Sequence, residues 1–165
     1  DTALGRVAAA INRACAAVDA EVMLLLENAA GQGSEIGASF LQLKKIIARV
    51  DREKRIGLCL DTAHAFAAGY NVATASGLEK TLAEIDRLLD LNRLRLLHLN
   101  DSKASCGSRV DRHWHVGRGC IGEKGFYRII NHRLLSNLPA IMETPKKKEG
   151  DDLQNMKTVR SLVAK

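Results

Sequence analysis

The sequence predicts an α/β fold built around a parallel sheet. Four short apolar runs each end at, or just before, a residue that can bind a metal ion, and amphipathic segments with helical spacing separate them. The residues that end the runs are 34, 37 and 45 positions apart. A strand with its covering helix needs about 30 residues or more, so this spacing indicates successive βα units. These residues are Glu27, Asp61, His98 and Glu143.

The predicted strands cover residues 22–27, 56–61, 94–100 and 138–143. They are rich in leucine, isoleucine and valine, which is typical of strands that are buried on both faces of a parallel sheet. In a parallel barrel, side chains at the carboxyl ends of the strands converge on one face, where enzymes of this architecture place their chemistry. The four residues at the strand ends are therefore expected to lie together.

Amphipathic periodicity predicts the helices that alternate with these strands. Three long helices are expected at 2–18, 38–50 and 77–91, and two shorter ones at 123–134 and 150–163. The apolar stripes of the three long helices are Val7, Ile11, Ala14, Cys15 and Val18; Phe40, Leu43, Ile46, Ile47 and Val50; and Leu78, Leu82, Ile85, Leu88 and Leu89.

A complete (β/α)8 barrel has about 250 residues, and four strands in 165 residues correspond to about half of one. Such a half would leave two sheet edges and an apolar wall uncovered. The chain begins at Asp1 with a helical segment and no strand before it. We therefore expect residues 1–165 to form a single domain that is the C-terminal half of a barrel. A small, self-sufficient α/β sheet is the alternative.

The composition is that of an ordinary globular protein, with 46% hydrophobic and 27% charged residues. No apolar run approaches the ~20 residues that span a bilayer, and no signal-peptide pattern opens the chain, so no membrane partner is expected. A formal net charge of +6 and a pI of about 9.3 favour an anionic partner, with nucleic acid as the first candidate.

The four cysteines are Cys15, Cys59, Cys106 and Cys120, and no two of them form a C-x-x-C pair. This pattern argues against a zinc ribbon and against a disulfide framework. Cys15 falls on a helical stripe and Cys59 lies inside a strand run, so both are expected to be core thiols. A reducing, cytoplasmic compartment is the resulting expectation.

The strand-end residues supply three carboxylates and one imidazole, a ligand set suited to zinc, manganese or magnesium. The alternative is that each acid only caps the helix that follows it, where negative charge is favourable. His64 lies three residues after Asp61, in what is expected to be a loop. From there it could reach a metal beside the one that Asp61 binds.

A long loop over residues 100–119 follows the third strand and adds further candidates. Asp111 and His113 are at positions i and i+2, so in extended backbone they point the same way. With His64 they could form a second metal site of two imidazoles and one carboxylate. The same loop has cations and hydroxyls that suit phosphate oxygens. These are Lys103, Arg109, Arg112, Arg118, Ser102, Ser105 and Ser108.

Four other features are expected to have structural roles. Trp114 is predicted to pack against the protein, and His115 and His132 to be surface or structural residues. The triplet at 146–148 is three lysines, which predicts a solvated turn that could also touch DNA.

Taken with their order, these stretches resemble the motifs of the endonuclease IV family of apurinic/apyrimidinic endonucleases, also called AP endonuclease family 2. The matching stretches are 27–33, 59–70, 98–103, 107–113, 117–122 and 143–145. The resemblance implies a xylose-isomerase-like (β/α)8 TIM barrel with three zinc ions at its C-terminal face. It also implies a monomeric, cytoplasmic enzyme, or a nuclear or mitochondrial one in a eukaryote.

The activity that the resemblance implies is DNA repair. Such an enzyme hydrolyses the phosphodiester 5′ to an abasic site in double-stranded DNA, leaves a 3′-hydroxyl for base excision repair, and trims blocked 3′ ends. Lys103, Ser108, Arg109 and Arg112 are the expected DNA contacts. Tyr70, in the loop after His64, could pack against distorted DNA or equally on the protein surface.

The resemblance also assigns roles to the metal-ligand candidates. Glu27 would bridge the first and second zinc ions, and Glu27 and Glu143 are the expected catalytic residues. The second site would be completed by Asp61, His98 and Glu143, and the third held by His64, Asp111 and His113. The family's first site also uses two histidines from the N-terminal half, which this chain does not contain, so this segment alone is expected to be inactive or nearly so.

Two other functions remain open at this point. A divalent-metal sugar isomerase or epimerase of the xylose-isomerase-like barrels would use the four strand-end ligands around one metal. It would have less reason to keep His64 together with Asp111, His113 and a cationic loop. A non-catalytic DNA-binding fragment is the second alternative.

Overall fold

The computed structural model describes residues 2–18 and 21–164 and has a four-stranded sheet in the order β1-β2-β3-β6. All neighbouring strands in it are parallel, which confirms the parallel α/β architecture predicted from the spacing. The strands are β1 (Leu24–Glu27), β2 (Ile56–Asp61), β3 (Leu94–His98) and β6 (Ala140–Ile141). A separate antiparallel ribbon pairs β4 (Asp101–Ser102) with β5 (His113–Trp114).

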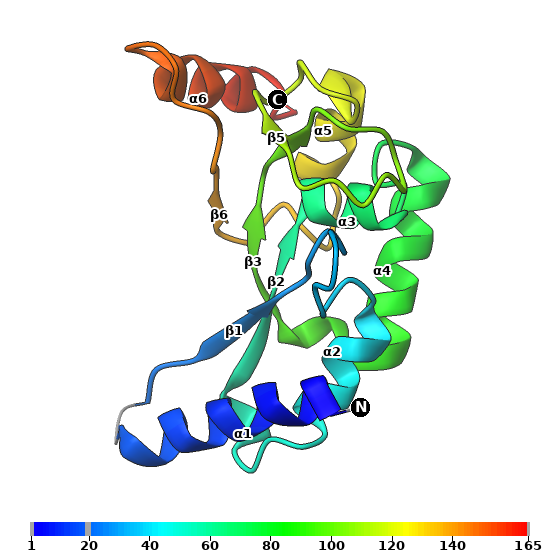
Figure 1. Ribbon diagram of the computed structural model, residues 1–165. Coiled ribbons are helices and arrows are strands. Elements are labelled where there is room, and N and C mark those ends of the chain that lie inside the picture. Colours follow the sequence, from blue (N-terminus) through cyan, green and yellow to red (C-terminus); the bar gives the residue numbers. More distant parts are fainter. Residues whose placement is uncertain (1, 19–20, 165) are drawn as a thin grey trace.

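Helices α2 and α4 lie along one side of this sheet, while α1 and α6 lie at opposite ends of the molecule (Figure 1). Helix α2 packs between α1 and α4, and α4 also contacts α5. None of the described helices is long and apolar enough to cross a bilayer. The helices are α1 (Thr2–Ala17), α2 (Phe40–Ile47), α3 (Thr62–Ala68), α4 (Ala75–Leu89), α5 (Gly122–Ile130) and α6 (Asp151–Ser161), with short 3-10 turns at Glu53–Arg55 and Leu91–Arg93.

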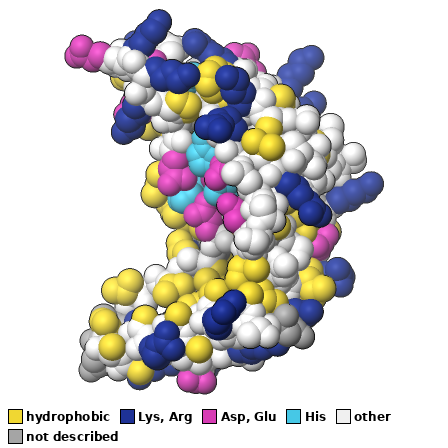
Figure 2. Space-filling model, viewed as in Figure 1, with side chains coloured by type: hydrophobic (Ala, Val, Ile, Leu, Met, Phe, Trp, Pro, Cys, Tyr) yellow, Lys and Arg dark blue, Asp and Glu magenta, His cyan; other side chains and the backbone are white. Residues whose placement is uncertain are grey.

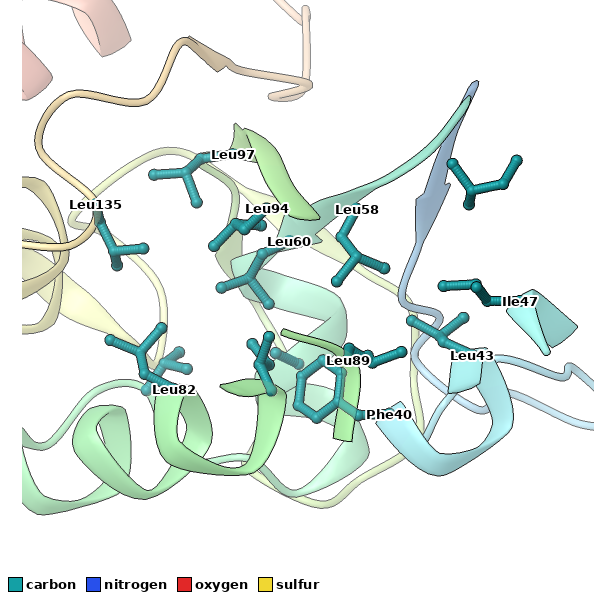
Figure 3. Packing of buried hydrophobic residues seen from close by; sticks show 14 of the residues in the cluster. Phe40, Leu43, Ile47, Leu58, Leu60, Leu82, Leu89, Leu94, Leu97 and Leu135 are labelled. Atoms are coloured by element: carbon teal, nitrogen blue, oxygen red, sulfur yellow. The ribbon is translucent and has the colours of Figure 1, made fainter. Parts of the chain in front are cut away.

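The hydrophobic core lies between the sheet and the helices α2 and α4. Figure 3 shows Leu58 and Leu60 of β2 on the side of the sheet that faces Phe40 of α2 and Leu89 of α4. Leu58 is 3% exposed and Leu60 2% exposed, and burying one such side chain fully stabilises the fold by roughly 1.5–3 kcal/mol. This burial fixes the orientation of β2 about its axis.

Because strand side chains alternate between the two faces, β2 presents Cys59 and Asp61 on the face away from these helices. Glu27 is paired with Cys59 in the β1–β2 register, and His98 with Asp61 in the β2–β3 register. The leucines that build the core thus place three of the strand-end candidates on the opposite face of the sheet.

Several predicted boundaries are wrong: β1 begins at Leu24 and not at 22, β3 ends at His98 and not at 100, α2 ends at Ile47 and not at 50, and α5 ends at Ile130 and not at 134. Two further differences have a clear physical reason. The first helix ends at Ala17, so Val18 lies outside it and is 55% exposed, and Leu4 and Ala8 share the buried stripe with Ile11. The last strand is reduced to two residues at Ala140–Ile141 instead of 138–143. Both of its residues are exposed, and it pairs with β3 alone among the described strands. A longer strand here would therefore gain little stability from burial.

The two outer strands have large apolar side chains near them that remain exposed. Val22 and Met23, just before β1, are 69% and 41% exposed, and Ile141 of β6 is 51% exposed. Figure 2 shows hydrophobic side chains spread over the lower part of the concave surface of the molecule. Open strand edges with apolar surroundings are surfaces on which further chain can pair and pack.

Candidate metal centre

Asp61 ends β2 and also begins helix α3. Its Oδ1 accepts a hydrogen bond from the backbone N–H of His64 at 2.8 Å, which caps α3. The expectation that His64 lies in a loop is wrong, because residues 62–68 are helical. The helix fixes His64 one turn beyond Asp61, so both side chains lie at the carboxyl edge of the sheet. The capping role and the ligand role of Asp61 are compatible, because they use different oxygens.

The strand-end residues converge around His98. Its Nδ1 lies 3.1 Å from Glu27 Oε1, 3.1 Å from Glu143 Oε2 and 3.8 Å from Asp61 Oδ2. The four residues form a group in which one ligand atom from each lies within 4.8 Å of the others. Glu143 belongs to this group although it lies beyond the shortened strand β6.

A second group joins α3 to the β4–β5 ribbon. His64 Nε2 and His113 Nε2 are 3.1 Å apart, and Asp111 Oδ1 lies 3.5 Å from each of them. Asp111 and His113 therefore do point the same way, as their i, i+2 spacing predicted. Tetrahedral zinc with bonds of about 2.0–2.1 Å holds its ligand atoms roughly 3.3 Å apart. The three separations fit one face of such a site.

The hydrogen bonds of the two imidazoles support the same assignment. His64 Nδ1 lies 2.9 Å from the Asn28 carbonyl oxygen, and His113 Nδ1 lies 3.0 Å from that of Glu143. A carbonyl oxygen only accepts, so in each ring Nδ1 is the donor and the neutral ring has its lone pair on Nε2. Two lone pairs that face each other at 3.1 Å need a cation or a proton between them. Orientation of a ligand histidine by a carbonyl is typical of metal sites.

The electrostatics of the cluster also favour a cation. Burial alone would lower the pKa of His64, but the hydrogen bond with Glu27 and the negative charges of Asp61 and Asp111 outweigh burial and raise this pKa to about 9. Burial raises the pKa of Glu27, and the hydrogen bond to His64 and the charge of His98 more than reverse this, so the Glu27 pKa is lowered. A metal ion bound here would replace the extra proton on His64, because metals bind the neutral imidazole.

The two groups adjoin each other. Asp61 Oδ2 lies 3.7 Å from His113 Nε2, and Glu27 Oε1 lies 3.2 Å from His64 Nδ1. Figure 2 shows the acidic and histidine side chains gathered in one concavity of the surface. The structure thus brings all seven candidate ligands together, and their function as metal ligands stays a prediction.

Cys59 was expected to be a core thiol, and it is 4% exposed. It also lies beside the metal-ligand candidates, in a group with Glu27 and His98. Burial, together with the charges of Glu27, Asp61 and Glu143, raises the pKa of Cys59 to about 12. Carboxylates and imidazoles therefore remain the better ligands. The alternation of side chains along β2, which places Cys59 on the Asp61 face, could have revealed this proximity.

Three polar residues that the sequence did not single out hold the strand ends in place. Asn100 donates to Asp61 Oδ2 and, at 3.2 Å, to Glu143 Oε2, and it accepts from the Glu143 N–H at 2.7 Å. Asn28 pairs with the Asp61 backbone through two hydrogen bonds of 2.9 and 3.1 Å. Thr62 Oγ1 donates to the Asn100 carbonyl at 2.7 Å. These bonds fix the carboxylates before any metal binds.

The segment after β3 is more ordered than the predicted long loop. The carboxylate of Asp101, which is fully buried, accepts four backbone hydrogen bonds of 2.8–3.3 Å. The donors are the N–H groups of Ser102, Gly119, Ile121 and Gly122. A Cβ at position 119 would overlap this carboxylate. Asp101 therefore joins the two ends of the segment that carries Asp111 and His113.

The predicted DNA contacts lie on or near this segment. Lys103, Arg109 and Arg112 are exposed, and Ser108 is half-buried, with its Oγ accepting from the Val110 N–H at 3.3 Å. Arg109 has a left-handed backbone, φ 54°, and its N–H donates to the Ala67 carbonyl at 2.9 Å. Contact with DNA stays a prediction for each of them.

Tyr70 is packed against the protein. Its ring centroid lies 4.5 Å from that of Phe40, and its hydroxyl donates to Glu84 Oε1 at 3.2 Å. The structure therefore gives Tyr70 a packing role, which was one of its two predicted alternatives. His132 is also structural, because its Nε2 lies 3.0 Å from Glu79 Oε1.

Asn155 of α6 is a further residue that the sequence did not reveal. It is 2% exposed, its Oδ1 accepts from the Val116 N–H at 3.0 Å, and its Nδ2 donates to Thr144 Oγ1 at 2.9 Å. It thereby joins the segments that carry His113 and Glu143. A buried asparagine with these partners would help to position both ligand candidates.

We expect Asn155→Ala to weaken zinc binding by roughly 10- to 100-fold, as the loss of groups that orient metal ligands typically does. Competition with a chromophoric zinc chelator measures this. Asn155→Asp keeps the acceptor for Val116 and should recover part of the affinity, and Gln154→Ala on the exposed side of α6 is the matched control. Unchanged zinc affinity with lowered thermal stability would mean that Asn155 only holds the fold.

Comparison with known proteins places this geometry in context. A family model described as "Xylose isomerase-like TIM barrel", of the AP endonuclease 2 type, matches residues 1–162. "Probable endonuclease 4" of Methanoculleus marisnigri is 49% identical over 159 residues, which are 96% of this chain and 56% of that protein. The "Probable endonuclease 4" of Chloroflexus aurantiacus is 44% identical over 165 residues, which are 99% of this chain and 58% of that protein.

Among solved structures, endonuclease IV from Thermus thermophilus superimposes with a TM-score of 0.74 at 38% identity. The match covers 85% of this chain and 49% of that one. This chain therefore spans about half the length of the relatives that it matches.

Proposed function

Because the chain belongs to the endonuclease IV family of xylose isomerase-like TIM barrels, we propose that the complete protein is a zinc-dependent endonuclease of base excision repair. It would hydrolyse the phosphodiester 5′ to an abasic site in double-stranded DNA and leave a 3′-hydroxyl. Trimming of blocked 3′ ends belongs to the same proposal, because it breaks the same kind of bond.

One observation carries the proposal. Four carboxylates and three imidazoles, from strand ends, from α3 and from the β4–β5 ribbon, lie in two adjoining groups at the carboxyl edge of the sheet. A metal centre needs ligand atoms of these types close together, and these residues come from distant parts of the sequence to supply them. A sugar isomerase built on the same sheet would need only the group around His98, so the second group of His64, Asp111 and His113 favours the nuclease.

The residues would divide the work as follows. Glu27, Asp61, His98 and Glu143 would hold one zinc ion, His64, Asp111 and His113 another, and Glu27 would be shared with a third. When bound, zinc lowers the pKa of water toward ~7 and stabilises negative charge on phosphoryl oxygens.

Exposure indicates which side of the cluster faces the substrate. The Asp61 side chain is fully buried, whereas those of Asp111 and Glu143 are 42% and 49% exposed and that of Glu27 is 34% exposed. The scissile phosphate would therefore approach over Glu27, Asp111 and Glu143, while Asp61 anchors the centre from within. Lys103 and Arg112 on the ribbon would hold the DNA backbone through its charge, which carries no sequence preference.

We also propose that the 165 residues are about half of a (β/α)8 barrel, corresponding to its C-terminal part. The relatives are nearly twice as long, the described sheet has four strands, and its outer strands have exposed apolar neighbours. The remaining ligands of the shared zinc ion and the remaining DNA-binding loops would come from the rest of the barrel. The 165-residue segment by itself should then be inactive or nearly so.

The test uses the full natural protein with two duplexes that differ only in one abasic site. We expect a metal-dependent cut at the abasic site, more than one zinc ion per protein, and loss of the cut after chelation followed by recovery with zinc. A single manganese or magnesium ion with sugar isomerisation would replace this proposal by the isomerase. Salt-sensitive binding to abasic DNA without cleavage would indicate a binding protein.

A further inference from the structure

Two lysines without a carboxylate partner in the described structure meet over one tryptophan next to the candidate metal centre. The Lys103 ammonium lies 4.4 Å from the centroid of the Trp114 ring, and that of Lys147 lies 5.1 Å from it. Neighbouring Lys146, in contrast, is paired with Asp152 at 3.0 Å. Cation–π attraction can gather two ammonium groups at one ring, and it leaves their N–H donors free for another ligand.

Both lysines are positioned by their backbones. The Lys103 N–H donates to the Arg112 carbonyl at 2.9 Å, which extends the β4–β5 ribbon. The N–H groups of Lys147 and Lys148 both donate to Asp151 Oδ2 at 2.9 Å, at the start of α6. The two segments are 44 residues apart in the sequence, and the ring of Trp114 is where they meet.

The ring itself is held in place. His115 lies edge-on to Trp114 at 5.4 Å, with its Nδ1 3.2 Å from Asn155 Nδ2. Trp114 thus contacts a histidine that is itself held by Asn155. The expected packing role of Trp114 holds, but what it packs against includes two charges.

This arrangement lies close to the metal-ligand candidates without sharing their face. Trp114 follows His113 in β5, and successive strand residues point to opposite faces. His113 points to His64, so Trp114 and its two lysines lie on the other side of the ribbon. An anion bound there is not the one at the metal centre.

We propose that Lys103, Trp114 and Lys147 form a binding site for a backbone phosphate of DNA other than the phosphate that is cleaved. The inference rests on the proposed function and adds to it a contact that holds the strand beside the cut. Two ammonium groups suit a phosphodiester because each is a point charge with three donors, and neither is neutralised by a carboxylate of the described residues.

Salt dependence of binding tests the site. In the full natural protein, equilibrium binding to an undamaged duplex is measured over a range of NaCl concentrations. Each backbone phosphate neutralised by a lysine contributes about 0.9 to the slope of log K against log salt, so one such contact changes the affinity by about eightfold when the salt concentration changes tenfold. Lys103→Gln and Lys147→Gln should each lower the slope by up to that amount.

Variants of Trp114 distinguish a site that depends on the ring from two unrelated surface charges. Trp114→Ala keeps both lysines but removes the ring, and it should also lower the slope and the affinity, whereas Trp114→Phe should recover most of both. Lys146→Gln makes the same change of charge one residue away, at a lysine that is already paired, and should have a smaller effect. Circular dichroism and zinc content of each variant verify that the fold and metal centre are intact.

The outcomes are distinct from those of the cleavage test. If the wild-type protein cuts at abasic sites but Lys147→Gln and Trp114→Ala bind DNA with the wild-type slope, the phosphate site is wrong and the nuclease stands. If Lys146→Gln matches Lys147→Gln, only diffuse charge is involved and the site is again wrong. If the wild-type protein neither cuts nor binds DNA, both proposals fall.

Discussion

Replacing Asp61 by asparagine should abolish most activity of the full natural protein, with a fall in kcat/KM on an abasic duplex of roughly 10³-fold or more. The substitution keeps the volume of the side chain and can keep the oxygen that caps α3 through the His64 N–H. It replaces the oxygen that lies 3.8 Å from His98 Nδ1 and 3.7 Å from His113 Nε2 by an NH2 group. An amide nitrogen is no ligand for zinc, and it would face the NH2 of Asn100.

The size of the effect follows from the position of Asp61 between the two groups of ligands. Losing a bound metal removes several kcal/mol of charge stabilisation, and each 1.36 kcal/mol is about tenfold in rate. Measuring the zinc content of the variant together with its kcat/KM shows whether the loss of activity accompanies a loss of zinc. Asp51→Asn, at an exposed position, is the matched control. Full zinc content and near-normal activity in Asp61→Asn would show that this carboxylate is not a ligand.

The second large effect concerns stability and involves no metal. Asp101→Ala should lower the free energy of unfolding by about 3–5 kcal/mol, because four backbone N–H groups lose their acceptor in a fully buried place. Each unsatisfied buried group costs about 1–3 kcal/mol, and water that enters the vacated space offsets part of the sum. Proteins typically have a free energy of unfolding of about 5–15 kcal/mol, so this loss would be a large fraction of the total stability.

Urea unfolding of the zinc-free full natural protein measures this change, with Asp51→Ala as the control at an exposed carboxylate. Hydrogen exchange should accelerate first at the amides of Gly119 and Ile121, which Asp101 binds directly. A loss of less than about 1 kcal/mol, with these amides still protected, would mean that the segment does not depend on Asp101.

The long, strongly patterned elements are the part of the fold that local sequence determines. The predicted strand 56–61 has the same bounds as β2. The reason is that an uninterrupted apolar run between two charged residues marks both ends of the strand. Helix α4 was predicted within two residues at each end. Helix α3 was missed because its seven residues are too few to show a helical period, although helix capping was one of the two roles predicted for Asp61.

Long-range hydrogen bonds are the part that the sequence could not reveal. Asn100 reaches Glu143 across 43 positions and Asn28 reaches Asp61 across 33, and both pairings depend on the final register of neighbouring strands. No local pattern distinguishes these asparagines from those in ordinary turns. The seven ligand candidates could be found because each is a carboxylate or an imidazole at the end of an apolar run or in the segment that follows one, which can be recognised without knowing its partners.

The two faces of strand β5 have a mechanical consequence. His113 and Trp114 are covalent neighbours that point to opposite sides of one short ribbon, so neither can shift without disturbing the other. If a ligand bound on one side of the ribbon favours the shape that binds the ligand on the other side, each ligand raises the affinity for the other by the same factor. This follows because coupling between two binding equilibria is reciprocal. If the proposed zinc and phosphate sites are coupled in this way, zinc should dissociate more slowly from the protein when it is bound to DNA than when it is free.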